Sequence, residues 1–251
     1  MSNDPALAAL IALHEGQPRE GPGDEALSLE ILRGLPPLPH GRIADLGCGS
    51  GAAALMLARE TGECVRAVDA TPQFLATLRE RALVEGLGDR IEAVEADFGA
   101  LAGAPGWPDG CLKLLWSEGA AYNLTFAGAL AAWTPLLAKD GIAVISEMSW
   151  FTDAPPPEAK AFWDEAYPAM ASEADNFAHA RAAGLDVLLT RRLPSQAWWD
   201  NYYGPLGARC DALAPTATDA MAAVIADTRR EMELFRRHCD AFGYTFYVLR
   251  R

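Results

Sequence analysis

The chain has 251 residues, 51% of them hydrophobic, which is enough to bury a large core and excludes a disordered chain. Its 34 acidic and 21 basic residues leave a net charge of -13, which argues against a nucleic-acid-binding protein and favours a small or cationic partner. The 5 cysteines are scattered without a C-x-x-C pair, which predicts reduced thiols in a cytoplasmic protein and no zinc site.

The first 41 residues are predicted to form a helical cap. Asp4 and Pro5 are a typical N-cap and first position for a helix over 6–13, and no basic segment of a secretory signal precedes it. Loops rich in glycine and proline at 19–23 and 35–41 enclose a second short helix.

From Arg42 onward, short apolar runs alternate with helical stretches, which is typical of βαβ units around a parallel sheet. The uncharged stretch 119–138 is interrupted by polar residues and Pro135, so it predicts a buried core helix and no membrane span. Strands are expected at 42–46, 64–68, 91–95, 111–116 and 142–147.

After Trp150 the pattern changes to a proline-rich loop followed by mostly helical segments. The segment 196–203 is dense in aromatic residues; it fits a lid over a ligand pocket, or more simply a hydrophobic cap on the sheet. The remaining expected elements are helices at 158–170, 174–183 and 217–241 and strands at 185–192 and 244–249.

The most informative motif is IADLGCGSG at 43–51, where a buried strand runs into three alternating glycines and then into a helix. Glycines at 47, 49 and 51 allow a sharp turn and let a ligand lie against bare peptide groups. The following helix presents free N–H groups and a positive dipole end to that ligand. The motif therefore predicts a cofactor loop.

Two further aspartates follow the next two predicted strands. Asp69 is placed to accept the ribose hydroxyls of an adenosine, and Asp97 is placed to accept an adenine amine beside the apolar surface of Phe98. Singly, each aspartate is more often a turn former or helix cap. Together with Asp45, they converge on the crevice where open α/β sheets bind ligands.

These motifs resemble the class I S-adenosylmethionine-dependent methyltransferases, from Arg42 to the final strand. The resemblance implies a Rossmann-like α/β fold with a seven-stranded, mostly parallel sheet, an antiparallel last strand, helices on both faces and extra helices after the fifth strand. It also implies one domain over 1–251, with the cap at 1–41, a cofactor-binding core at 42–150 and an acceptor-side part at 151–251. The residues implied to bind S-adenosylmethionine are Asp45, Gly47, Cys48, Gly49, Gly51, Asp69, Ala70, Asp97, Phe98, Ser117 and Glu118.

The stretches WSEGAAYN at 116–123, SEMSWF at 146–151 and REGPG at 19–23 are similar to one bacterial subgroup of small-molecule methyltransferases. That resemblance indicates a small-molecule acceptor but leaves its identity open. It also leaves open whether the protein is a monomer or a homodimer. An Asn/Asp-Pro-Pro-Tyr run, which the nucleic-acid and protein-amide N-methyltransferases use, is missing after the fourth predicted strand.

Four residues are candidates for proton transfer from the acceptor. Glu118 and Glu147 follow the fourth and fifth predicted strands, whose ends face the cofactor's methyl group, and Tyr122 lies near Glu118. Glu118 is equally explained as a charge in the first turn of a helix, and Tyr122 as a core residue. His14 is the fourth, because N-terminal segments of this family often cover the cofactor; the four histidines have no metal-ligand spacing.

Two alternatives remain. Gly47, Gly49 and Ala52 also satisfy the dinucleotide pattern G-x-G-x-x-G/A of a nicotinamide-dependent oxidoreductase, although no tyrosine has a lysine four residues later. A cofactor-binding protein without turnover is the other alternative, because no single catalytic residue stands out.

Overall fold

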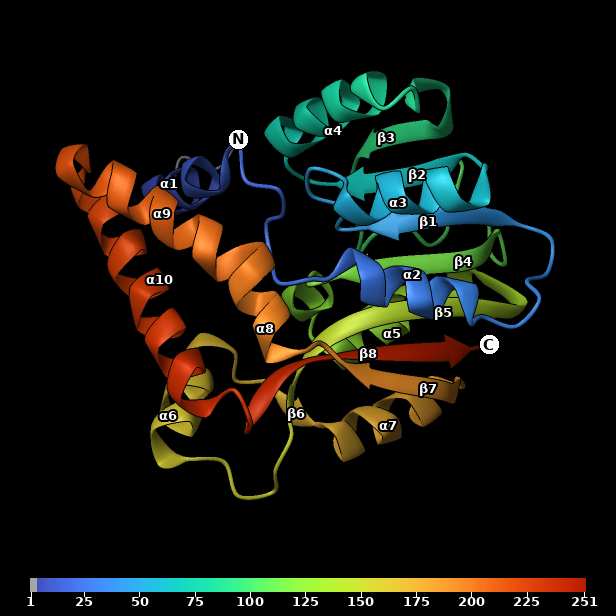
Figure 1. Ribbon diagram of the computed structural model, residues 1–251. Helices are drawn as coiled ribbons and strands as arrows, with labels where there is room; N and C mark the ends of the chain where they lie inside the picture. Colours follow the sequence, from blue (N-terminus) through green and yellow to red (C-terminus); the bar gives the residue numbers. More distant parts are fainter. Residues whose placement is uncertain (1–3) are drawn as a thin grey trace.

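The computed structural model describes residues 4–251 and has a mixed β-sheet at its centre (Figure 1). The strand order is β3-β2-β1-β4-β5-β8-β7, and the two-residue β6 pairs with β5 off this path. The strands are β1 (Arg42–Leu46), β2 (Val65–Asp69), β3 (Ile91–Glu95), β4 (Leu112–Glu118), β5 (Leu137–Trp150), β6 (Ala171–Ser172), β7 (Asp186–Arg192) and β8 (Phe242–Arg250).

Strands β1 to β5 run parallel, whereas β8 lies between β5 and β7 and is antiparallel to both. The expected mostly parallel sheet with an antiparallel last strand is therefore confirmed. Because the five parallel strands point the same way, their carboxyl ends meet at one edge of the sheet. The glycine loop after β1 lies at this edge.

Helices cover both faces of the sheet, as the alternation of buried side chains along β1 requires. Ile43 packs into the core shared with α2 and α3, while Ala44 and Leu46 pack into the core shared with α5 and α7. The helices are α1 (Pro5–His14), α2 (Glu25–Arg33), α3 (Ala52–Thr61), α4 (Pro72–Val84), α5 (Phe126–Trp133), α6 (Pro157–Ala166), α7 (Glu173–Ala182), α8 (Ser195–Trp198), α9 (Gly204–Leu213) and α10 (Asp219–His238).

Four helices, α1, α8, α9 and α10, stand beyond the carboxyl edge of the strands, and we call this group the cap (Figure 1). Of the helices expected within 1–41, α1 belongs to this group, whereas α2 packs against α3. Helix α1 contacts both α9 and α10, so the two ends of the chain build this cap together. Between α8 and α9 the residues Trp199–Tyr203 form a π-helical turn, a rare element that is frequent at functional sites. The aromatic segment of the sequence is thus a bent helix within the cap.

The strand predicted at 142–147 is longer in the structure. It begins at Leu137, which pairs with Leu112 of β4, and it ends at Trp150, because it pairs with β8 over nine positions from Ile142 to Trp150. The expected core helix at 119–138 shortens to α5, since Leu137 already belongs to β5. The helix predicted at 158–170 ends at Ala166.

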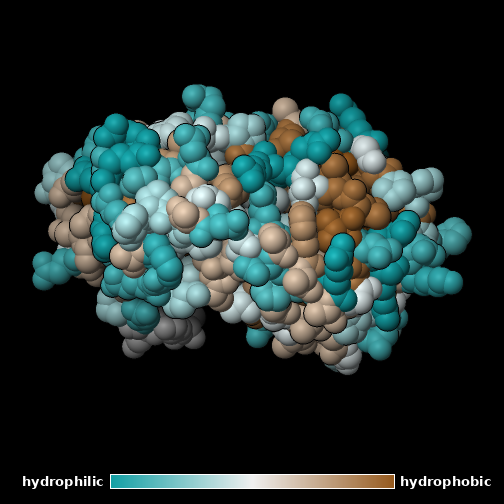
Figure 2. Space-filling view, turned by 90° about the horizontal axis from the view of Figure 1, so that it is seen from below, coloured by the Kyte–Doolittle hydropathy of each residue, from teal (hydrophilic) through white to brown (hydrophobic). Residues whose placement is uncertain are grey.

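Many charged and polar residues of the chain lie on its surface. One face, seen from below, is mostly hydrophilic with a compact apolar area (Figure 2). Among residues 4–251, no helix combines the length and apolar character needed to cross a membrane.

Candidate cofactor and acceptor site

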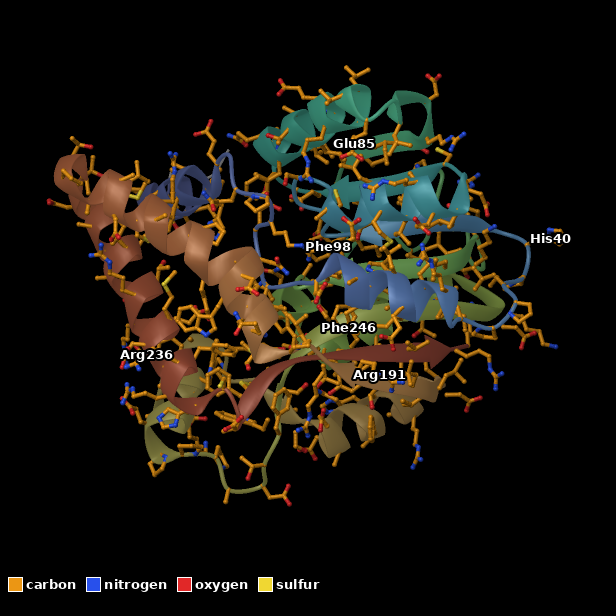
Figure 3. All side chains as sticks on the ribbon, viewed as in Figure 1. His40, Glu85, Phe98, Arg191, Arg236 and Phe246 are labelled. Carbon is orange, nitrogen blue, oxygen red and sulfur yellow. The ribbon has the colours of Figure 1, made fainter. Side chains whose placement is uncertain are left out.

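A cavity of about 750 Å³ opens at the carboxyl edge of the parallel strands, within the size range of small-molecule sites. The ends of β1 to β4 form its floor, and α1, the π-helical turn and α10 form the side that we call the cap side. Residues 15–24, which we call the strap, connect α1 to α2 and also line it. Phe98 lies at this edge, whereas His40 lies at the opposite edge of the sheet (Figure 3).

The glycine loop forms a bare cradle in the cavity wall. Gly47 has a φ of +74°, and a side chain there would put Cβ 2.2 Å from Cβ of Ala120. Gly49 has a φ of +52°, and its Cβ would lie 2.2 Å from Oε2 of Glu20 on the strap. Both positions thus require glycine, because φ is positive and a side chain would collide with Ala120 or with the strap.

Asp45 at the end of β1 is a buried carboxylate without a complete set of partners. Its side chain is 1% exposed and lines the cavity, and its Oδ2 is buried without a hydrogen bond among the described residues. Burial raises the pKa of Asp45 well above its ordinary value, and the charges of Glu118 and Asp69 add to this effect. A cationic group bound in the cavity would satisfy this oxygen.

Asp69 and Asp97 lie at the ends of β2 and β3, as expected, and both line the cavity. Asp69 accepts N–H bonds from Gly49 at 2.9 Å and Thr71 at 2.8 Å, which fix the carboxylate and leave lone pairs for a ligand. Asp97 uses Oδ1 to accept the N–H of Gly99 at 2.8 Å. Three successive strand ends therefore present carboxylates to one cavity.

The strap is tied to the sheet by two carboxylates. Glu118 accepts three bonds: from Arg19 at 2.9 Å, from the Ser28 hydroxyl at 2.7 Å and from the Trp116 indole at 2.8 Å. Glu20 accepts the N–H of Ser50 at 3.0 Å, at the start of α3. The strap thus lies directly over the glycine loop.

The cap side brings His14, Tyr122, Tyr202 and Glu231 to the cavity. His14 is 7% exposed; its Nδ1 lies 2.9 Å from the Leu10 carbonyl oxygen and its Nε2 lies 3.1 Å from the Tyr202 hydroxyl. Burial lowers the pKa of His14. Tyr122 is 47% exposed, so its ring is available to a ligand.

Three residues predicted for the site do not line the cavity. Gly51 packs against Leu78 of α4, and the buried Ser117 donates its hydroxyl to the Leu46 carbonyl at 2.8 Å. Glu147 is 2% exposed within β5, because that strand continues beyond the register of Glu118. The other predicted residues, Cys48 and Ala70 among them, line the cavity.

Glu147 has no hydrogen bond from either carboxyl oxygen among the described residues. Burial raises its pKa to about 8, against a smaller opposing effect of the nearby Tyr167 hydroxyl. The ring of Tyr167 contacts that of Tyr122 edge to face at 6.1 Å between centroids. Glu147 is thus a buried acid near Tyr167, whose ring contacts the cavity-lining Tyr122.

The structure also adds residues that sequence reasoning missed. Glu20 lies in the REGPG segment, where the sequence indicates a loop but not its course. Glu231 is one of many charged residues of α10, and no local signal distinguishes it. Among residues 4–251, no group of three or more His, Cys, Asp or Glu side chains is placed to hold a metal ion.

One protein-family model matches part of the chain. Residues 43–141 match the family model described as a methyltransferase domain, and no curated protein matches the sequence.

Similar solved structures cover almost the whole chain. YjhP from E. coli is 22% identical over 96% of this chain and 98% of its own, with a TM-score of 0.81. An S-adenosylmethionine-dependent methyltransferase from Geobacter sulfurreducens, in complex with S-adenosyl-L-homocysteine, is 19% identical over 98% and 97%, with a TM-score of 0.76. The [4+2]-cyclase SpnF is 17% identical over 98% and 93%, with a TM-score of 0.76.

The cyclase shows that the fold accommodates more than one chemistry, so the likeness in structure identifies the fold and not the reaction. Residues 43–141 therefore resemble a methyltransferase domain, and the chain has the class I methyltransferase fold from β1 to β8.

Proposed function

We propose that this protein is an S-adenosylmethionine-dependent methyltransferase that acts on a small-molecule acceptor in the cytoplasm. The observation that carries the proposal is the unpaired, buried Oδ2 of Asp45 beside the bare glycine loop. A cofactor with an ammonium group and a sulfonium charge supplies the positive charge that this carboxylate lacks.

The residues present fit that cofactor. Asp45 and the peptide groups of Gly47 and Gly49 would hold its methionine part, Asp69 its ribose hydroxyls and Asp97 its adenine. When bound, S-adenosylmethionine supplies a methyl carbon that is electrophilic because it is attached to a sulfonium. The chain's own task is to hold an acceptor in line with that carbon, and such positioning contributes roughly 7 to 11 kcal/mol.

A nicotinamide dinucleotide fits less well. Its diphosphate would lie at the glycine loop and the start of α3. In this structure Glu20 already accepts the Ser50 N–H there, and Asp45 and Asp69 add negative charge. Charge repulsion therefore opposes the oxidoreductase alternative.

The four catalytic candidates differ in what their surroundings allow. Glu118 accepts three hydrogen bonds and is best explained as the residue that positions the strap. Tyr122 and the His14–Tyr202 pair face the cavity and remain candidates for contact with the acceptor. Glu147 is buried away from the cavity lining.

Isothermal titration with S-adenosylmethionine, S-adenosylhomocysteine and NAD tests the proposal. We expect the two adenosyl ligands to bind and the Asp45→Asn variant to bind S-adenosylmethionine about 10- to 100-fold more weakly, the value of a hydrogen bond to a charged group. The exposed Asp89→Asn variant is the control. Binding of NAD alone would reverse the assignment, and release of S-adenosylhomocysteine with any acceptor would exclude a protein without turnover.

A further inference from the structure

The cap side of the cavity is lined by apolar side chains of α1 and by a few polar groups. Leu7 and Leu10 of α1 are 45% and 42% exposed and line the cavity together with Ile11. Tyr122 also lines the cavity, and it is 47% exposed. Because large apolar side chains are exposed here, this side suits the apolar body of an acceptor.

Glu231 of α10 is the acidic group of this side. The Tyr203 hydroxyl donates to its Oε1 at 2.7 Å, and no ion pair with a basic side chain forms among the described residues. Burial raises the pKa of Glu231 and of the neighbouring Tyr122 and Tyr202 hydroxyls, and the charge of Glu231 adds to the effect on both tyrosines. The carboxylate therefore lacks a cation inside an aromatic enclosure.

The His14–Tyr202 pair adds a second acceptor. The Leu10 carbonyl can only accept, so Nδ1 of His14 carries a proton, and Nε2 of the neutral ring accepts the Tyr202 hydroxyl proton. The lowered pKa of His14 favours this neutral form. The Tyr202 oxygen, having donated its proton, offers lone pairs to the cavity.

Positive side chains are scarce around the whole cavity. Arg19 is the one arginine of the described lining, which has no lysine, and it is paired with Glu118 at 2.9 Å. The carboxylates of the lining are Glu20, Asp45, Asp69, Asp97, Glu118 and Glu231. An acceptor that carries a phosphate or carboxylate would find repulsion here and no free partner.

We infer that the methyl acceptor is an amine with an apolar body and no anionic group, bound as an ammonium between Glu231, the Tyr202 oxygen and the ring of Tyr122. This assignment rests on the proposed function. Two acceptor oxygens and an aromatic face match a ligand that only donates hydrogen bonds.

The same arrangement accounts for the proton that a primary or secondary ammonium must lose. It would pass from nitrogen to the Glu231 carboxylate, which becomes a neutral acid, and the nitrogen would keep the electron pair that forms the new N–C bond. The bond between sulfur and the methyl carbon would break at the same time, with its electron pair staying on sulfur, so that S-adenosylhomocysteine is the leaving group. A carboxylate that burial has made more basic is suited to hold that proton near neutral pH.

The test compares three probes of one shape: phenethylamine, the neutral 2-phenylethanol and phenylalanine, which adds a carboxylate. Each is titrated calorimetrically into protein saturated with S-adenosylhomocysteine, at a pH where the amine is charged. We expect phenethylamine to bind about 10- to 100-fold more tightly than the alcohol, and phenylalanine to lose most of that advantage.

Glu231→Gln keeps an oxygen for the Tyr203 hydroxyl and should abolish the preference for phenethylamine while S-adenosylhomocysteine still binds. Glu233→Gln is the matched control, because Glu233 lies on the same helix but pairs with Arg236 on its outer side (Figure 3). Tyr202→Phe should reduce amine binding by several-fold.

Failure of S-adenosylhomocysteine to bind the wild-type protein overturns the proposed function itself. If it binds but the three probes bind alike, or none binds, the amine assignment is wrong. A preference that survives in Glu231→Gln also overturns it.

Discussion

Replacing Glu147 by glutamine is expected to stabilise the protein by an amount that grows with pH. The folded chain holds this carboxyl as a neutral acid, because burial raises its pKa from an ordinary 4.5 to about 8. The unfolded chain releases the proton above pH 4.5. Between pH 4.5 and 8 the native state therefore binds more protons, and a rise in pH favours unfolding.

The size of the effect follows from the shift. Each pH unit in that interval lowers the free energy of unfolding of the wild type by about 1.4 kcal/mol relative to the variant, or roughly 5 kcal/mol over the whole interval. Below pH 4.5 both states are protonated, and above pH 8 both are ionised, so the difference is constant there.

Urea unfolding followed by the fluorescence of the 7 tryptophans, at pH values from 5 to 9, measures this difference. The amide in the Glu147→Gln variant makes different contacts from a protonated acid, so the two proteins can differ in their free energy of unfolding by an amount that does not depend on pH. The test is the change of that difference with pH. Glu165→Gln, at an exposed position of α6, serves as the control. A difference between Glu147→Gln and wild type that does not change with pH would refute the reasoning.

Two further substitutions test the cradle and the strap. Gly49→Ala should weaken S-adenosylhomocysteine binding at least about tenfold, because Cβ would collide with Glu20 and displace the strap from the glycine loop. Gly86→Ala, with a φ of +70° and open space, carries only the backbone strain of about 1–2 kcal/mol. Equal binding by both variants would show that the cradle is not the ligand site. Glu118→Ala should lower the free energy of unfolding by roughly 3 kcal/mol and expose the strap to limited proteolysis, since it leaves a buried arginine unpaired. Glu63→Ala, which breaks a more exposed pair, should cost under about 1 kcal/mol, and an equal loss in both would contradict the positioning role.

The cofactor half of the site is predictable because its signals are local in the sequence. The strands predicted at 42–46 and 91–95 have the same bounds in the structure, and the glycine loop follows the first of them directly. Asp69 and Asp97 reach the cavity because parallel strands end at a common edge.

The acceptor half depends on contacts between distant parts of the chain. Pairing with β8 extends β5 to Trp150, and this places Glu147 inside the sheet where the sequence suggested a strand end. Glu231 faces inward only because α10 packs against α1, more than two hundred residues earlier. The local sequence does not predict such a contact between distant helices. The amphipathic pattern of α10 identifies the helix, but it does not indicate which of its acidic residues lines a cavity.

The position of α1 decides where a fusion tag is attached. This helix begins at Pro5 and contributes part of the cavity wall, so a bulky tag before it would lie close to the cavity. The carboxyl terminus follows β8 and lies at the far end of the sheet from the cap (Figure 1). Purification and surface-capture experiments should therefore use a tag after Arg251, where immobilisation takes place away from the cap.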